Sequence, residues 1–172
     1  MQQKNQTRRL VFAALLIALE IILTRFVQIP IPLDGFTNRI SLGFLPVAMG
    51  GMLYGPLWGG LLAAIADIIR ALLFPQGAIN PLFTLTAFLR GTVYGSFLYK
   101  KISPLRITLA AACDFLLINL LLNPLFTFLS YGGTFWARVM TALPVSAVNF
   151  ALRLVLLLCV LPPMERSVRR HV

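Results

Sequence analysis

Residues 42–74 read LGFLPVAMGGMLYGPLWGGLLAAIADIIRALLF, and this stretch decides the fold class. It contains two apolar segments, Leu42–Leu57 and Trp58–Phe74, with the turn Gly55-Pro56-Leu57-Trp58-Gly59 at their junction. Apolar runs of this kind are long enough, as helices, to cross roughly 30 Å of hydrocarbon. Because only a short turn separates them, we predict that they form a tight helical hairpin.

The composition of the whole chain is that of a membrane protein. Hydrophobic residues make up 59% of the 172 residues and charged residues 12%, whereas globular domains are near half apolar and a quarter charged. The net charge of +10 raises the question of nucleic-acid binding. The basic residues lie at segment ends rather than on one polar face, so we assign the charge to membrane topology and expect no nucleic-acid partner.

Six apolar segments are each interpreted as a transmembrane helix. Arg8 and Arg9 before the first segment resemble the start of a signal peptide, but no small-residue cleavage site follows, so we expect this helix to be retained. The sequence therefore predicts an all-α polytopic membrane protein, with residues 1–172 forming a single integral membrane domain. The predicted helices are about Leu10–Val27, Leu42–Leu57, Trp58–Phe74, Leu82–Tyr99, Ile107–Leu129 and Val139–Leu161.

The basic residues predict the orientation of the bundle. Three groups precede the first helix, separate the fourth from the fifth, and follow the sixth, so six crossings place all three on one side. We expect that side to be the cytoplasm, and we expect both termini to lie there. The groups are Lys4, Arg8 and Arg9; Lys100, Lys101 and Arg106; and Arg166, Arg169 and Arg170.

The loops on the opposite side are longer and contain more residues typical of turns and binding sites. Loops 28–41, 75–81 and 130–137 contain prolines, glycines, asparagines and aromatic residues, whereas the turns on the cytoplasmic side are short. This asymmetry predicts a site that opens to the outside of the cell.

Small residues recur at four-residue spacing, which in lipid lets helix backbones approach closely. For the glycines we favour packing within the bundle. Ala14 and Ala18 on the first helix are open to a second interpretation, since a helix at the bundle edge could use them to dock another subunit. The glycines are Gly51, Gly55 and Gly59, with Gly91 and Gly95 in the fourth helix.

Charges inside the membrane are costly unless they are paired or face a cavity. Asp67 and Arg70 are three residues apart and can pair on one helical face. Two longer-range pairs, Asp67–Arg90 and Asp114–Arg153, are structural alternatives to a role in ligand binding. So many polar groups in a small bundle favour a water-accessible or ligand-filled cavity.

Further polar residues follow the helical repeat. Thr86 and Tyr94 lie one turn to either side of Arg90 and form a polar stripe with it. Asn149 and Arg153 share a face of the sixth helix. Asn119 and Asn123 share a face of the fifth, and on an α-helix Asp114 points well away from them.

Arg25, Arg39 and Arg138 are expected at the outer rim, against the positive-inside bias. Because guanidinium groups bind carboxylates bidentately, an anionic ligand would explain them, and lipid headgroups are the alternative. Aromatic residues of the same region could stack on a flat ring or form an interfacial belt. They are Phe36, Phe83, Tyr131, Phe135 and Trp136.

The sequence offers no arrangement typical of an enzyme. Glu20 could serve a proton relay, but no second titratable group is spaced to act with it. Cys113 and Cys159 lie in apolar segments and lack ligand spacing. We therefore expect no catalytic residues, no metal site and no cofactor.

The chain resembles the substrate-binding S components of energy-coupling factor (ECF) vitamin transporters, most closely the folate-specific members. The resemblance covers essentially the whole chain. It rests on Arg39-Ile40-Ser41-Leu42-Gly43-Phe44-Leu45-Pro46, on Gly51–Gly60, on Asp67, on Asn80–Gly91, and on Ala14-x-x-x-Ala18, which is similar to the docking motif of such proteins.

The resemblance implies a subunit in the bacterial cell membrane that captures a vitamin from outside. It implies docking through Ala14 and Ala18 on a transmembrane scaffold with two ATPase subunits, which drive release inside. The alternatives are an S component for pantothenate or a thiamine precursor, and a stand-alone gradient-driven transporter. With folate as ligand, the expected binding residues are Arg25 and Arg39 for its carboxylates, with Asp67, Arg90, Phe83 and Asn149 for the pterin.

Overall fold

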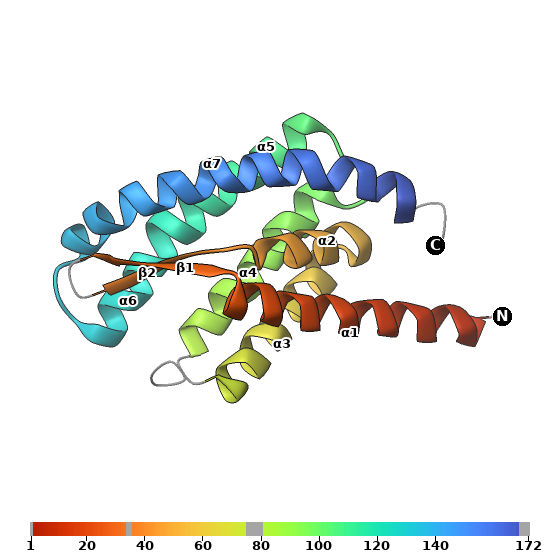
Figure 1. Cartoon of the computed structure of the whole chain (residues 1–172), viewed down its shortest axis with the longest axis horizontal. Coiled ribbons are helices and arrows are strands. Elements are labelled where there is room, and N and C mark those ends of the chain that lie inside the picture. The colour runs from red at the N-terminus through yellow and green to blue at the C-terminus, as the bar shows by residue number, and fades with distance from the viewer. Residues whose placement is uncertain (1, 34–35, 75–80, 169–172) are drawn as a thin grey trace.

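In the computed structural model of the chain, the described residues are 2–33, 36–74 and 81–168, without the side chains of residues 2–6, 28–40, 131, 141 and 166–168. Helices dominate the fold, and a two-stranded hairpin follows the first of them (Figure 1). The order is α1 (Gln2–Phe26), β1 (Gln28–Leu33), β2 (Phe36–Ser41), α2 (Phe44–Tyr54), α3 (Pro56–Leu73), α4 (Pro81–Leu98), α5 (Pro104–Cys113), the π-helix η1 (Asp114–Leu122), α6 (Asn123–Tyr131) and α7 (Phe135–Val168).

The predicted six-helix bundle is confirmed over the part of the chain that is described. Helices α5, η1 and α6 follow one another without a break and form one long rod, so the helices make six rods. The start of α1 and the end of α7 lie at one end of the bundle, here called the terminal end (Figure 1). The β1–β2 hairpin, the end of α6 and the start of α7 lie at the other, the hairpin end.

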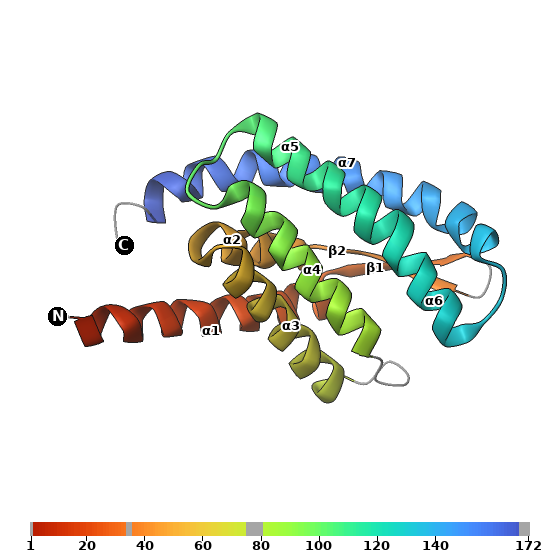
Figure 2. The same ribbon diagram turned by 180° about the vertical axis from the view of Figure 1, so that it is seen from behind.

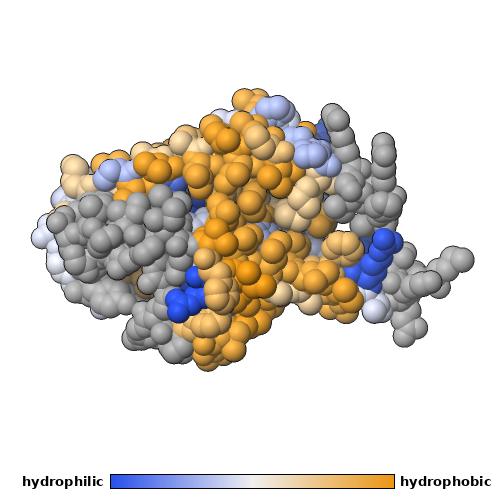
Figure 3. Space-filling view, in the orientation of Figure 1, coloured by the Kyte–Doolittle hydropathy of each residue, from blue (hydrophilic) through white to orange (hydrophobic). Residues whose placement is uncertain are grey.

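The surface is suited to a lipid environment. Three helical stretches are long and apolar enough to cross a membrane: Pro56–Leu73, Pro104–Ser130 and Phe135–Glu165. Apolar residues form a broad band across the middle of the molecule (Figure 3). Large apolar side chains such as Leu105 and Val155 are 68% and 61% exposed. Such side chains are stable on a surface that faces lipid rather than water.

The segment 28–41 is not the irregular loop that we predicted. β1 and β2 pair antiparallel, with Gln28 opposite Ser41 and Leu33 opposite Phe36. Pro30 and Pro32 are two residues apart, so their backbone nitrogens face the same side of β1. If that side points away from β2, neither proline is required to donate a hydrogen bond to the neighbouring strand. The prolines indicated a loop, but a two-stranded ribbon tolerates them at its free edge.

Glycines bring α2, α3 and α4 into backbone contact, as predicted. A β-carbon added to Gly51 would lie 2.6 Å from the backbone nitrogen of Gly95, and one added to Gly59 would lie 2.6 Å from the Cα of Gly51. Figure 2 shows α4 running across α2 and α3. Only glycine permits such an approach, so this three-helix unit depends on residues without side chains.

The fifth rod changes its helical type in the middle. Residues 114–122 form a π-helix, in which hydrogen bonds join residues five apart. Pro124 lies two residues beyond its end, and in an α-helix the proline ring would clash with the carbonyl of Leu120, to which it also cannot donate. In the wider turn of the π-helix, residues five apart such as Asp114 and Asn119 come onto one face.

Candidate ligand-binding site

A buried carboxylate lies between two arginines in the interior of the bundle. Nε of Arg90 on α4 donates to Oδ1 of Asp114 at 2.9 Å, and Nη1 of Arg153 on α7 pairs with Oδ2. Asp114 is fully buried, whereas the side chain of Arg90 is 24% exposed. These three residues, the Asp114 triad, connect three rods of the bundle.

The triad confirms one predicted ion pair and overturns another prediction. Asp114 pairs with Arg153 as predicted, but Arg90 pairs with Asp114 and not with Asp67. Asn119, which we predicted to point away from Asp114, donates to its Oδ2 at 3.0 Å and to its backbone oxygen at 3.1 Å. The π-helix is the reason, because residues five apart come close to one face there.

A second polar group, the Asp67 cluster, lies between α3 and α4. Arg70 pairs with Oδ1 of Asp67, as its three-residue spacing predicted, and the hydroxyl of Thr84 donates to Oδ2 at 3.0 Å. Asp67 is buried. Both clusters include a residue of α4, Thr84 in one and Arg90 in the other.

Other polar residues that we predicted inside the bundle also face its interior. Thr86 and Tyr94 are buried on either side of Arg90, which confirms the predicted polar stripe. Asn149 is 8% exposed and donates to the backbone oxygen of Val145 at 3.1 Å, one turn before Arg153. Its amide oxygen and its second amide hydrogen remain available for other partners.

Two of the predicted rim residues are described in full. The Cζ atom of Arg25 lies 5.2 Å from the ring centre of Phe74, so a cation–π contact joins the two side chains. Phe83 is half-buried in the first turn of α4. Arg39 lies in β2 opposite Pro30, and its side chain is outside the described residues.

Arg138 differs from the other rim arginines. It is buried, and its Nε and Nη2 donate to the backbone oxygen of Gly132 at 3.0 and 2.6 Å. The loop that follows α6 is therefore closed onto α7 by this side chain. We conclude that Arg138 stabilises that loop.

The charges of the two clusters and of Glu20 balance. Glu20, Asp67 and Asp114 are three carboxylates, and Arg70, Arg90 and Arg153 are three guanidinium groups. Some polar atoms of this interior are buried without a hydrogen-bond partner among the described residues: Oε2 of Glu20, Nε of Arg70, the hydroxyl of Tyr94 and Nε of Arg153. A neutral interior with unused donors and acceptors is suited to a polar organic ligand.

The described residues contain no group of three or more His, Cys, Asp or Glu side chains that would hold a metal ion. Ala14 and Ala18 are both exposed on α1, beside other exposed apolar residues, and so lie on a surface open to a partner. A membrane-spanning bundle of this kind, with a charged and incompletely satisfied interior, defines a membrane subunit that binds a solute.

Comparisons with known proteins identify the family. Residues 4–165 match the family described as the S component of the ECF-type riboflavin transporter. The chain is 40% identical over 147 residues to the folate transporter FolT of Clostridium novyi, which covers 85% of this chain and 77% of that protein. The FolT of Leuconostoc mesenteroides is 33% identical over 132 residues, 74% of this chain and 68% of that protein.

A crystal structure of FolT bound with folic acid superposes with a TM-score of 0.78 and 34% sequence identity, over 87% of this chain and 88% of that chain. The chain belongs to the S-component family of ECF transporters, as its resemblance to that family predicted. It therefore belongs to a family of membrane transporter components.

Proposed function

We propose that this protein is the folate-binding subunit of an ATP-driven ECF uptake transporter in the bacterial plasma membrane. The observation that carries the proposal is the similarity over most of the chain to FolT with folic acid bound. In this proposal the hairpin end faces outward and both termini lie in the cytoplasm, as the basic residues predict. Residues 1–172 act as one substrate-binding domain without catalytic activity.

The two ends of folate require different chemistry. The glutamate carboxylates would bind near the rim, where Arg25 lies beside Phe74 and where β2 contributes Arg39. The pterin ring would enter the bundle toward Asp67, Arg90 and Asn149, with Phe83 available for stacking. A ring edge with amino and N–H donors beside a carbonyl is complementary to carboxylate, amide and guanidinium groups.

A ligand panel tests this assignment directly. Purified protein in detergent should bind folate with nanomolar-scale affinity by calorimetric titration. Riboflavin, after which the matched family is described, should bind at least a hundredfold more weakly, and so should pantothenate and a thiamine precursor. Riboflavin is uncharged and leaves the rim arginines without a partner, whereas pantothenate carries one carboxylate but no flat ring for the interior. Millimolar or absent binding of folate would overturn the vitamin assignment.

We expect Arg25→Ala to weaken folate binding at least tenfold, which corresponds to about 1.4 kcal/mol. The substitution removes a guanidinium that is held at the rim by Phe74, and with it a charge-assisted contact to a carboxylate. Arg106→Ala is the matched control, because Arg106 is exposed in α5 next to the terminal end. An unchanged dissociation constant for Arg25→Ala would remove this residue from the site.

The energy for transport would come from partner subunits. We propose that Ala14 and Ala18 form the surface through which the protein docks on a transmembrane scaffold that binds two ATPase subunits. Both side chains are small and exposed, so a partner helix can approach the backbone of α1 closely.

Ala14→Leu and Ala18→Leu should therefore abolish co-purification with the scaffold while leaving the dissociation constant for folate unchanged. Ala151→Leu is the control, since Ala151 is also exposed but lies on α7. Normal assembly of the two α1 variants would exclude this docking surface. Uptake of folate into liposomes that contain only this protein, without ATP, would instead support a gradient-driven transporter that acts alone.

A further inference from the structure

Phe74 lies at the end of α3 and contacts the last two residues of α1. The Cζ atom of Arg25 lies 5.2 Å from the centre of the Phe74 ring. The ring of Phe26 meets the same ring edge to face, with the ring centres 6.4 Å apart and the planes at 83°. The backbone N–H of Phe74 donates to the carbonyl of Arg70 at 2.9 Å. The aromatic ring is therefore attached to α3 and contacts the end of α1.

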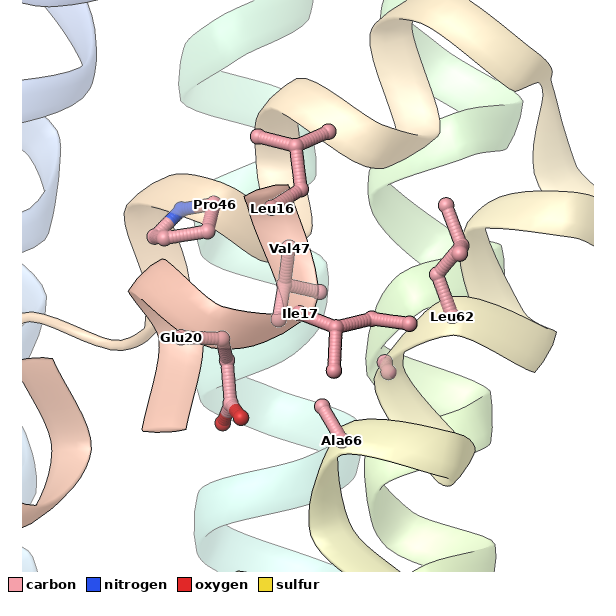
Figure 4. A pocket seen from close by; sticks show the side chains of 8 residues that line it. Leu16, Ile17, Glu20, Pro46, Val47, Leu62 and Ala66 are labelled. Carbon is pink, nitrogen blue, oxygen red and sulfur yellow. The ribbon is translucent and has the colours of Figure 1, made fainter. Parts of the chain in front are cut away.

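This contact follows from the way α1 and α3 lie against each other. Ile17 of α1 and Ala66 of α3 line the same small pocket (Figure 4). They lie eight residues before Arg25 and Phe74, respectively. A helix rises about 1.5 Å per residue, so both helices advance by about 12 Å between the pocket and the contact of Arg25 with Phe74. α1 and α3 therefore run side by side in the same direction, and their ends meet at this contact.

The charge of Arg25 is not used in the interior of the bundle. Arg25 makes none of the three interior ion pairs, which end on Asp67 or Asp114. A long arginine side chain loses rotamer freedom when it is held in one geometry, and this loss weakens any contact that it then makes. Contact with an aromatic ring restricts the side chain before a ligand arrives. A guanidinium in such a contact can still donate hydrogen bonds in its own plane to a carboxylate.

We propose that Phe74 is a positioning residue for carboxylate recognition: it holds the guanidinium of Arg25 in the geometry that binds the glutamate end of the ligand. This inference rests on the proposed function, in which Arg25 binds a carboxylate, and it adds the residue through which α3 sets the affinity for that group. An aliphatic side chain of similar size would fill the same space but would not attract the cation. The contribution of Phe74 therefore depends on its aromatic ring and on the charge of the ligand.

The test compares folate with its diamide, in which both glutamate carboxylates are carboxamides, by calorimetric titration. We expect Phe74→Leu and Phe74→Met to bind folate about fivefold more weakly than the wild type, the size of one cation–π contact, and to bind the diamide equally well. Phe74→Tyr keeps an aromatic ring and should bind both ligands like the wild type. Phe26→Leu is the matched control: it removes the second ring of the cluster but keeps the contact of Arg25, so both affinities should be unchanged.

A double-mutant cycle identifies the residue through which Phe74 acts. In the Arg25→Ala background, Phe74→Leu should cause no further loss of folate affinity, because the cation that the ring positions is absent. If the two losses add up instead, Phe74 acts independently of Arg25, and the inference is overturned.

The remaining outcomes separate this inference from the proposed function. Equal weakening of folate and the diamide by Phe74→Leu, with a lowered thermal unfolding temperature, would assign the ring a structural role at the junction of α1 and α3. An unchanged folate affinity in Phe74→Leu, or a wild type that binds the two ligands equally well, would also overturn the inference. In each of these cases the wild type binds folate, and the proposed function stands. Absence of folate binding by the wild type would instead overturn the proposed function itself.

Discussion

Asp114→Ala is expected to be the most damaging single substitution in the interior of this protein. It would leave Arg90 and Arg153 without the carboxylate that both of them bind, and Asn119 without its acceptor. Removing one partner from a buried ion pair typically costs about 3–5 kcal/mol. We expect a large fall in the thermal unfolding temperature in detergent and little monodisperse protein.

Two variants serve as controls for this prediction. Asp114→Asn keeps one carbonyl acceptor in the same place and should recover part of the lost stability. Asp67→Ala removes a carboxylate whose partner, Arg70, has a side chain that is 29% exposed, so its arginine can find other partners and the loss should be smaller. An Asp114→Ala protein that unfolds at the wild-type temperature would show that the triad does not stabilise the bundle.

Gly91→Ala is expected to separate α3 from α4. The added β-carbon would lie 2.7 Å from the carbonyl carbon of Gly59 and 2.8 Å from the Cα of Gly60, and backbone atoms cannot rotate away as a side chain would. Overpacking of this kind typically costs about 1–3 kcal/mol, more than the roughly 1 kcal/mol by which alanine favours a helix over glycine. Because Arg90 is the preceding residue, ligand affinity should fall together with the unfolding temperature.

Gly50→Ala is the matched control on α2. Its β-carbon would meet only the Cδ1 atom of Leu62, at 3.4 Å, and that side chain can adjust. We therefore expect this variant to be as stable as the wild type or slightly more stable. If Gly91→Ala were also neutral, close backbone packing between α3 and α4 would not be needed for the fold.

The helices were predictable because a membrane imposes simple rules on a sequence. Long apolar runs ended by charges or turn residues predicted six rods, and the ends of α3 and α4 differ from the prediction by two residues or fewer. The Gly55-Pro56 junction predicted the hairpin of α2 and α3, where Gly55 has φ of 88° and Pro56 begins the next helix. These features are local, so neighbouring residues specify them.

The β1–β2 hairpin was not predictable in the same way. Its strands contain Pro30 and Pro32, residues that usually exclude a segment from a sheet. Whether a proline interrupts a strand depends on which edge its missing N–H would face. That edge follows from the pairing with β2, which the order of residues does not reveal.

The candidate site, too, could be predicted from the sequence only in part. The intramembrane charges were identified from the sequence, since polar residues are rare within apolar runs, but half of the proposed long-range pairings were wrong. Pro124 was the overlooked signal: it accompanies the π-helix that turns Asp114 toward Asn119. Glu20 was considered as part of a proton relay, and its free oxygen became visible only when α1 was placed against α2 and α3.

The sequence by itself determined that this chain is a six-helix membrane protein of the S-component family, and which of its residues are charged within the bundle. Only the tertiary structure decided that Arg90 binds Asp114, that Arg138 closes a loop, and that one oxygen of Glu20 finds no partner among the described residues. The physical reason is the distance along the chain over which each effect acts. Hydrophobicity and helix ends act over a few residues, whereas the partner of a buried charge depends on how distant helices are rotated against one another.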